Sequence, residues 1–464
     1  MSISIKFCGA VRTVTGSMHL VSAFDSSILL DCGLFHGRRD ETYEVNSNFS
    51  FNPKDVSACI ISHAHIDHCG NLPNLIKKGF ESLVFTTPPT KELCAYMLSD
   101  SGYIQEEDVK FVNKINKKRG LPLKMPLYTQ EDALASLKYL KSLEYHKKFS
   151  LTKEIELTFF NAGHILGSAI PVLDIKTKKG STRIAYAVDL GRHGMPLLRD
   201  PEIPNDIDYL IIESTYGGRE HATIADAEQE LADAVNRTIA RNGKIIIPSF
   251  ALERTQLIVF FISELIKQGK IKKIPIYVDS PLAVNLTNVF RKNWEYFDDK
   301  TKQAFSEQHD PLGYDNITYI TQVNDSKKLN ALKKPMIIIS ASGMCESGRI
   351  LHHLKNNINN PDNTIISIGF MAKNTLGRSI VERNKIVKIF GAPHNLNAEV
   401  VTLNAFSSHA DKNGLVEYVK NCTKRLKKVF IVHGEQEQSE VLMNSIKKLN
   451  IKTMIPVKNE IIHL

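Results

Sequence analysis

Short apolar runs that end in a polar residue recur through the N-terminal part of the chain. Their length and their branched or aromatic residues are typical of buried β-strands. Four of the runs deliver an aspartate or a histidine at the strand end: "SSILLDCG" at Asp31, "VSACIISH" at His63, "ELTFFNAGH" at His164 and "TRIAYAVDLG" at Asp189. The pattern predicts a strand-rich region with reactive side chains at its strand ends.

The pattern changes at about residue 217. Leu231, Val235 and Ile239 recur at helical spacing up to an Asn-Gly pair, and apolar strands then alternate with helices. Such alternation predicts a parallel sheet flanked by helices. Near Asn395 the earlier pattern returns, so we expect residues 217–394 to be an insertion between two parts of one domain, 1–216 and 395–464.

Composition and charge describe an ordinary globular chain with a basic balance. Of 464 residues, 42% are hydrophobic, and no apolar run approaches the ~20 residues that cross a bilayer. The seven cysteines are scattered, which favours reduced thiols and a cytoplasmic location. Lys and Arg exceed Asp and Glu by 59 − 50 = 9, with basic clusters at 114–119 and 424–428. This excess predicts either a solvated basic surface or a polyanionic partner.

A dense group of potential metal ligands follows the apolar run Val56–Ser62. The stretch "ISHAHIDHCG" places His63, His65, Asp67 and His68 within six residues. Neutral imidazole and carboxylate suit zinc, and a buried strand that ends in four such groups packs poorly unless something binds them. A polar surface turn with incidental histidines is the simpler alternative, and the spacing favours a metal site.

The candidate ligands exceed what one tetrahedral zinc ion takes, so they predict two metals that share a ligand. His63 and His65 alternate and point to one side of an extended segment, whereas Asp67 and His68 lie past the bend and can face a second metal. Asp189 can bridge both metals through its two carboxylate oxygens. The full set is His63, His65, Asp67, His68, His164, Asp189 and His433.

These motifs resemble a known superfamily. H-x-H-x-D-H, then G-H-x-x-G-S-A, then a strand-end aspartate are similar to the metallo-β-lactamase pattern. Three further pieces, in "IIESTYGGR", "FSSHAD" and "VHGE", narrow the resemblance to the β-CASP branch of nucleases: Glu213, His409 and His433. The resemblance implies an α/β fold, with a four-layered αβ/βα domain and an inserted β-CASP domain. It also implies two Zn²⁺ per chain, no small-molecule cofactor and hydrolysis of RNA phosphodiester bonds.

The resemblance also implies a role for each metal ligand. His63, His65 and His164 would hold one zinc, Asp67, His68 and His433 the other, and Asp189 would bridge them. Asp31 matches the first motif of the family, and it would orient a ligand histidine rather than touch metal, since a histidine ligand needs its second nitrogen fixed.

The resemblance assigns the remaining catalytic residues as well. Asp31 and Asp67 belong to the catalytic set, and the two metals would supply a hydroxide nucleophile. His409 would donate a proton to the leaving oxygen, and Glu213 would hydrogen-bond its other nitrogen. The alternative is that His409 only supports a metal ligand.

Two stretches of the insertion predict contacts with RNA. "SASGMCESGRI" and "MAKNTLGRS" each follow a strand, and backbone N–H groups at such turns can bind phosphate. Ordinary turns are the alternative. Relatives often carry a glutamine where Met371 stands here, and Asn374 can adopt the left-handed backbone of the missing glycine. The predicted RNA contacts are Ser342, Gly343, Arg349, Thr375, Gly377 and Arg378.

We therefore expect a zinc-dependent ribonuclease acting on single-stranded RNA, as an endonuclease, a 5′-exonuclease or both. Two other enzymatic functions stay open, a β-CASP nuclease acting on DNA and a small-molecule hydrolase of the same superfamily. An inactive RNA-binding scaffold is the alternative of another class. The expected partner is single-stranded RNA, a homodimer stays open, and no membrane partner is expected.

Overall fold

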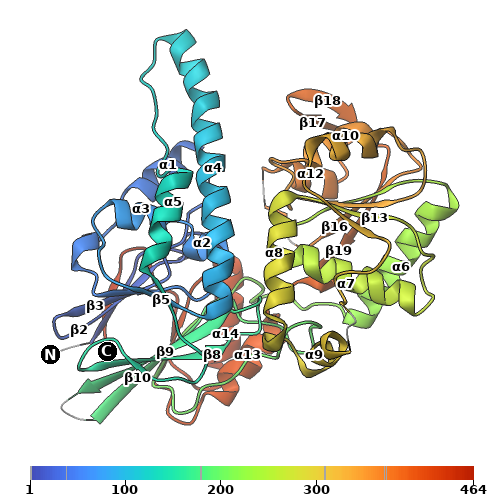
Figure 1. The fold of residues 1–464 in the computed structure, drawn as a ribbon. Coiled ribbons are helices and arrows are strands. Elements are labelled where there is room, and N and C mark those ends of the chain that lie inside the picture. Colours follow the sequence, from blue (N-terminus) through green and yellow to red (C-terminus); the bar gives the residue numbers. More distant parts are fainter. Residues whose placement is uncertain (1–2, 38, 178–179, 308–309, 370, 373) are drawn as a thin grey trace. The chain divides into compact units, whose positions relative to one another are not determined.

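The computed structural model describes residues 3–37, 39–177, 180–307, 310–369, 371–372 and 374–464. The chain forms two compact units (Figure 1). Unit 1 comprises Met1–Gly194, Leu198–Glu220 and Ser408–Leu464, and unit 2 comprises Met195–Leu197 and His221–Ser407. Each unit is described by itself.

Unit 1 contains two seven-stranded sheets. The first has the order β22 (Ile461–His463), β1 (Ser4–Phe7), β2 (His19–Ala23), β3 (Ser26–Leu30), β4 (Ala58–Ile60), β5 (Val84–Thr86) and β6 (Leu140–Ser142). The second has the order β21 (Thr453–Met454), β20 (Lys428–Ile431), β11 (Tyr209–Ile212), β10 (Gly180–Ala187), β9 (Ala169–Thr177), β8 (Ile155–Asn161) and β7 (Phe149–Ser150).

The two sheets enclose one core, and helices cover their outer faces. In β10, Ile184 and Tyr186 point into the core between the sheets, whereas Ala185 and Ala187 pack under α13 and α14. This alternation is the period of two that strands impose on their side chains. Figure 1 shows the blue and cyan helices on the first sheet. The helices of unit 1 are α1 (Arg39–Ser47), α2 (Ile66–Cys69), α3 (Leu72–Lys77), α4 (Pro88–Arg119), α5 (Gln130–Ser136), α13 (Lys412–Asn421) and α14 (Gln436–Lys447).

Unit 2 contains a six-stranded parallel sheet and a small hairpin. The sheet has the order β14 (Ile317–Ile320), β13 (Ile276–Asp279), β15 (Ile337–Ser340), β12 (Ile245–Pro248), β16 (Thr364–Ile368) and β19 (Glu399–Leu403), and the hairpin pairs β17 (Ile386–Ile389) with β18 (Ala392–Asn395). The helices are α6 (Ile224–Ala240), α7 (Arg254–Lys267), α8 (Pro281–Lys292), α9 (Asp299–Ser306), α10 (Val323–Ala331), α11 (Ile350–Asn357) and α12 (Leu376–Val381).

Short 3₁₀ turns complete the elements, at Pro53–Asp55, Leu137–Tyr139, Trp294–Tyr296 and Asn404–Phe406. The last strand of the unit 2 sheet directly precedes the return to unit 1. Strand β19 pairs in parallel with β16 of unit 2, and unit 1 resumes at Ser408. An isolated strand pattern does not reveal which sheet the strand joins, and the domain limits 1–216, 217–394 and 395–464 stay a prediction.

Candidate metal centre

Every candidate ligand lies in unit 1, just beyond a strand end. His63 and His65 follow β4, His164 follows β8, Asp189 follows β10 and His433 follows β20. Asp67 and His68 lie on the one-turn helix α2. The four ligands from His63 to His68 follow a strand of the first sheet, whereas His164, Asp189 and His433 follow strands of the second sheet. The fold therefore brings these side chains together at one edge of the two-sheet core. The outermost pair, His63 and His433, is 370 positions apart in the sequence.

Three candidate site residues have a backbone conformation that costs energy. The φ angles of Asp31, Asp189 and His433 are 58°, 59° and 47°. A non-glycine residue in this left-handed region is uncommon, and such strain concentrates at functional sites. Three of the strand ends that the sequence pattern marks thus carry this conformation.

Gly33 allows the strand end at Asp31 to pack directly against α2. A Cβ atom on Gly33 would lie 1.6 Å from the carbonyl oxygen of Asp67. Cys32 N–H donates to the carbonyl of His68, and Leu34 N–H donates to the carbonyl of Ile66. This backbone-to-backbone contact holds Asp67 and His68 in place.

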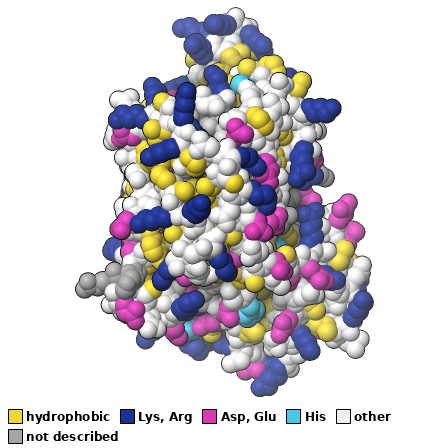
Figure 2. Space-filling model, turned by 90° about the vertical axis from the view of Figure 1, so that its right-hand side faces the viewer, with side chains coloured by type: hydrophobic (Ala, Val, Ile, Leu, Met, Phe, Trp, Pro, Cys, Tyr) yellow, Lys and Arg dark blue, Asp and Glu magenta, His cyan; other side chains and the backbone are white. Residues whose placement is uncertain are grey.

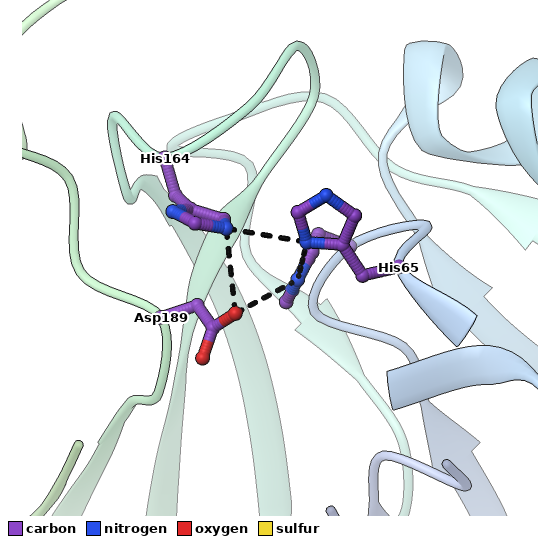
Figure 3. A group of neighbouring side chains, drawn as sticks. His65, His164 and Asp189 are labelled. Carbon is purple, nitrogen blue, oxygen red and sulfur yellow. Dashed lines mark hydrogen bonds and ion pairs between the residues drawn. The ribbon is translucent and has the colours of Figure 1, made fainter. Parts of the chain in front are cut away.

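The first ligand group consists of three histidines and Asp189 (Figure 3). His65 Nδ1 lies 3.1 Å from His63 Nε2 and 3.2 Å from His164 Nε2. Asp189 Oδ2 lies 3.3 Å from His63 Nε2 and 3.3 Å from His164 Nε2. The four atoms surround one point, and all four side chains are buried or half-buried.

The second group consists of Asp67, His68 and His433. The Nε2 atoms of His68 and His433 lie 3.1 Å apart, and Asp67 Oδ2 lies 3.4 Å from His433 Nε2. Asp189 Oδ1, the oxygen that does not face the first group, lies 3.4 Å from His68 Nε2. The two oxygens of Asp189 thus face the two groups separately, which is the arrangement that a bridging carboxylate requires.

The donor set fits a metal better than it fits a metal-free core. Four ligands about 2.0–2.1 Å from a tetrahedral zinc ion would lie about 3.3 Å apart, which agrees with the separations in the first group. Without an ion, buried ring nitrogens with lone pairs face one another. Asp189 Oδ1 is buried and has no hydrogen-bond partner among the described residues. Such unsatisfied buried acceptors cost free energy unless something binds them.

Burial favours the neutral form of the three histidines of the first group, the form that a metal ligand needs. Burial lowers the pKa of His65 to about 3, and it also lowers the pKa of His63 and, by more, that of His164. His68 of the second group differs. Burial lowers its pKa, but the carboxylates of Asp189, Asp67 and Asp31 together raise that pKa well above the usual range.

Asp31 is a fully buried carboxylate that lies against a candidate ligand, His68. Its Oδ2 lies 2.7 Å from His68 Nδ1. Ser62 donates both its N–H and its hydroxyl to Asp31, and the hydroxyl of Tyr186 donates at 2.9 Å. His63 Nδ1 lies 3.0 Å from Ser62 Oγ. Ser62 and Tyr186 do not stand out in the sequence: Ser62 is marked by its position beside His63, and Tyr186 by an inward-facing position on a strand.

His409 and Glu213 form a pair beside the first ligand group. His409 Nδ1 lies 3.0 Å and 3.1 Å from the two carboxylate oxygens of Glu213, and its ring lies 4.5 Å from that of His164 between centroids. Glu213 is fully buried and also accepts from Leu190 N–H. Glu213 could join Asp189 and His433 in a third ligand group, but these hydrogen bonds already occupy its oxygens.

The predicted RNA-contact residues lie together in unit 2, in two segments that hydrogen-bond each other. Gly377 N–H donates to the carbonyl of Met344, and Leu376 N–H donates to Glu346 at 2.7 Å. Thr375 caps α12. Asn374 has a φ of 66°, which confirms the left-handed turn expected at that position.

The side chains in these segments are already partly engaged. Ser342 Oγ accepts from two backbone N–H groups in its own turn, and Gly343 packs against the ring of Phe250. Arg349 donates from Nη1 to Asp279 at 2.6 Å and from Nη2 to the carbonyl of Thr321. Arg378 donates to Glu382 and is partly exposed. Arg378 is therefore more available to a ligand than Arg349.

Comparison with known proteins places this geometry in a family. Residues 20–198 match a metallo-beta-lactamase superfamily domain, 255–380 a Beta-Casp domain, and 393–456 a Zn-dependent metallo-hydrolase RNA specificity domain. A protein from Thermus thermophilus named as a ribonuclease is 33% identical over 431 residues, 93% of each chain. The chain belongs to the β-CASP family of the metallo-β-lactamase superfamily. This membership confirms the predicted fold class and resemblance.

Other β-CASP relatives span the whole chain. An RNase J-like protein of Methanocaldococcus jannaschii is 33% identical over 99% of both chains, and the transcription termination factor FttA of that organism is 30% identical over all of this chain and 72% of its own. A solved structure from Enterococcus faecalis, of unknown function, shares the fold with a TM-score of 0.55 and 14% identity. The metallo-β-lactamase fold implies that the chain binds divalent metal, and its histidine and aspartate groups are able to do so.

Within the part of the chain that the structure describes, no helix has both the length and the apolar character needed to span a membrane.

Proposed function

We propose that the chain is a zinc-dependent ribonuclease that hydrolyses phosphodiester bonds of single-stranded RNA. The observation that carries the proposal is the pair of ligand groups that share Asp189, with the His409–Glu213 pair beside them. Relatives along the whole chain that are named as ribonucleases support the same chemistry.

The ligand groups suit two zinc ions. His63, His65 and His164 would hold one, Asp67, His68 and His433 would hold the other, and Asp189 would bridge them. Two ions held there would make a hydroxide nucleophile available near neutral pH and compensate charge on the phosphate. Asp31 keeps the His68 ring in the orientation that presents Nε2 to the centre.

His409 is suited to donate the proton that the leaving oxygen needs. The departing ribose oxygen is strongly basic, so a positioned acid lowers the barrier to its departure. Glu213 accepts at His409 Nδ1 and fixes the orientation of the ring, and Nε2 is the nitrogen that would donate the proton. The His409 side chain is 17% exposed, which leaves it accessible to a substrate.

RNA contacts in unit 2 complete the proposal. Ser342, Gly343, Thr375, Gly377 and Arg378 would touch the substrate directly. Arg349, whose guanidinium is bound to Asp279 and Thr321, would instead hold its turn in shape. The cytoplasmic location, a homodimer, and the choice between internal and 5′-terminal cutting stay predictions.

The decisive experiment compares substrates. Purified protein is incubated with 5′-labelled single-stranded RNA, with DNA of the same sequence and with duplex RNA. We expect cutting of single-stranded RNA, weaker at higher salt because phosphate contacts release counterions. Equal or faster cutting of DNA would support a DNA nuclease. Hydrolysis of small lactams or thioesters without nuclease activity would support a small-molecule hydrolase, and either result would overturn the proposal.

A further inference from the structure

The end of α4 and the segment that returns from it form an arm, residues 109–129, in unit 1. Helix α4 has 32 residues, so it is about 48 Å long. It ends at Arg119, and the C-cap residue Gly120 adopts the left-handed conformation with a φ of 68°. Figure 1 shows the far half of α4 extending past α5, with the chain running back beside it.

The arm is held together by specific side-chain contacts. Asn113 donates to the carbonyl of Lys124 and accepts from its N–H, and Asn116 donates to the carbonyl of Pro122. Both asparagines lie on α4, and their partners lie on the return segment. The arm is therefore an ordered projection of unit 1.

The charge of the arm is entirely positive. Residues 109–129 contain six Lys and Arg and no Asp or Glu. Within the described residues, Lys110 pairs with Glu107 at 2.7 Å, whereas Lys114, Lys117 and Lys118 have no carboxylate within 4.0 Å. Figure 2 shows dark-blue side chains gathered at the top of the view, where α4 ends.

The second basic cluster of the chain, at 424–428, has no such excess of unpaired charge. Arg425 and Lys427 lie 3.3 Å and 3.1 Å from the carboxylate of Asp208, and Lys424 lies 3.8 Å from Asp206. The two clusters look alike in sequence, and only the arm leaves several charges available to a partner.

Aromatic side chains continue the basic face toward the metal centre. From Tyr96 onward, at 100° per residue, one face of α4 about 100° wide carries the two tyrosines and four lysines, and also a serine and two acidic residues, of which Glu107 pairs with Lys110. In chain order they are Tyr96, Ser99, Asp100, Tyr103, Glu107, Lys110, Lys114, Lys117 and Lys118. Tyr96 and Tyr103 are 40% and 52% exposed, which is unusual for aromatic rings on a helix that already packs against its unit. Exposed aromatic rings followed by unpaired cations are the two components of a surface that binds single-stranded nucleic acid.

The near end of α4 is anchored beside the candidate metal centre. The hydroxyls of Thr87 and Thr90 donate to the carbonyl of Gly167, at 2.6 Å and 2.8 Å. Gly167 lies three residues after His164, in the same turn. From this anchor, the face runs about 45 Å to Lys117, at 1.5 Å per residue of helix.

We propose that this face of α4 is a second binding site for RNA, which holds the substrate strand at a distance from the bond that is cut. The tyrosines stack on bases, and Lys114, Lys117 and Lys118 contact phosphates. With 3.4 Å per stacked nucleotide, a strand that covers the about 45 Å from the anchor of α4 to Lys117 needs about 13 nucleotides. The inference rests on the ribonuclease proposal for its substrate, and it predicts that RNA length decides whether the arm contributes.

The test compares two triple variants that remove equal charge from unit 1. The first is Lys114→Gln, Lys117→Gln and Lys118→Gln. The matched control is Lys147→Gln, Lys148→Gln and Lys153→Gln, three exposed lysines outside the arm. Binding of labelled RNAs of about 6 and about 30 nucleotides is measured by fluorescence anisotropy in full-length protein that also carries His409→Ala to slow cutting.

For the long RNA, we expect the arm triple variant to weaken binding on the order of ten- to a hundredfold near 0.1 M salt. The slope of the logarithm of the binding constant against the logarithm of the salt concentration should fall in magnitude by about 2, since each phosphate contact on a single strand contributes about 0.7. The short RNA should bind equally to all variants. Tyr103→Ser should also weaken binding of the long RNA, without a change in salt slope, because stacking releases no counterions.

Three results would overturn the inference. Equal weakening by the control triple would mean a non-specific effect of charge. Unchanged binding of the long RNA by the arm triple would exclude the arm as an RNA site. A change in sedimentation of the RNA-free protein, with no change in RNA binding, would assign the arm to a protein partner. Cutting of the short RNA by the unmodified protein tests the ribonuclease function separately.

Discussion

At the scale of single residues, the buried polar groups around the candidate metal centre mainly orient its histidine rings. Asp31 aligns His68, Ser62 links His63 to Asp31, and Glu213 aligns His409. A histidine acts as ligand or acid through one nitrogen only if the other is fixed by a hydrogen bond. The side chains that do not touch a metal are therefore as specific to this site as the ligands.

Replacing His409 distinguishes its two possible roles, as the acid that protonates the leaving oxygen and as a support for the metal ligands. We expect His409→Ala to keep its metal and to lose on the order of 10²–10⁴-fold in the rate of RNA cutting, because no proton reaches the leaving oxygen. An RNA with sulfur in place of the leaving 3′ oxygen should recover much of that rate, since a thiolate leaves without a proton. Metal content and single-turnover rates are the measurements.

The matched control is His146→Ala, which removes another histidine–carboxylate pair, His146–Glu202, from an exposed position in unit 1. It should change neither metal content nor rate. Loss of metal from His409→Ala, or failure of sulfur to restore cutting, contradicts the role as an acid.

At the scale of elements, loops at strand ends are held by buried charges in both units. In unit 2, Asp279 ends β13 and is fully buried. Its carboxylate binds Arg349, His353 of α11 and Ser326 of α10. One carboxylate thus joins a strand, two helices and the turn that carries the predicted RNA contacts.

Removal of that carboxylate should destabilise unit 2. We expect Asp279→Ala to lower the free energy of unfolding by about 3–5 kcal/mol, because the half-buried guanidinium of Arg349 loses its ion-pair partner and the buried side chains of His353 and Ser326 lose a hydrogen-bond partner. The single tryptophan, Trp294, lies in unit 2, so its fluorescence during urea unfolding reports on this unit. Asp315→Ala is the control, since that side chain is 97% exposed and should change stability by less than about 1 kcal/mol.

The buried carboxylate of Asp279 also predicts that the free energy of unfolding depends on pH. Burial raises the pKa of Asp279, but hydrogen bonds from His353, Ser326 and Arg349 outweigh burial and lower it overall. A carboxyl whose pKa is lower in the folded state stabilises the fold above its unfolded value, about 3.9, and loses this contribution as the pH falls through the folded value. The difference in the free energy of unfolding between the unmodified protein and Asp279→Ala should therefore become smaller as the pH falls. A difference in unfolding free energy that stays constant down to pH 2 would contradict a lowered pKa of Asp279 in the folded state.

At the scale of the whole molecule, metal binding and folding of unit 1 are coupled. The ligands come from both sheets and from segments between residues 63 and 433, so an ion bound there links distant parts of the chain. A ligand that binds only the folded state stabilises it by mass action, by about 4 kcal/mol at a thousand times its dissociation constant.

We expect metal analysis to find close to two zinc ions per chain and calorimetry to show a lower melting temperature after chelation. Asp189→Ala should reduce occupancy of both sites, whereas His433→Ala should mainly reduce the second, because the two oxygens of Asp189 face different groups. His146→Ala serves again as the control. A zinc content well below one per chain in protein purified without chelator would contradict the two-metal site.

The sequence by itself determined the family, the fold class and the candidate ligand set, because strand-end motifs are local and their residue types suit one chemistry. Only the tertiary structure decided that Ser62 and Tyr186 support Asp31 and that β19 joins the sheet of unit 2. It also distinguished two basic clusters that look alike in sequence, since Asp208 approaches Arg425 and Lys427 through folding. Local patterns record side-chain chemistry and strand periodicity, whereas partners distant along the chain are set by packing.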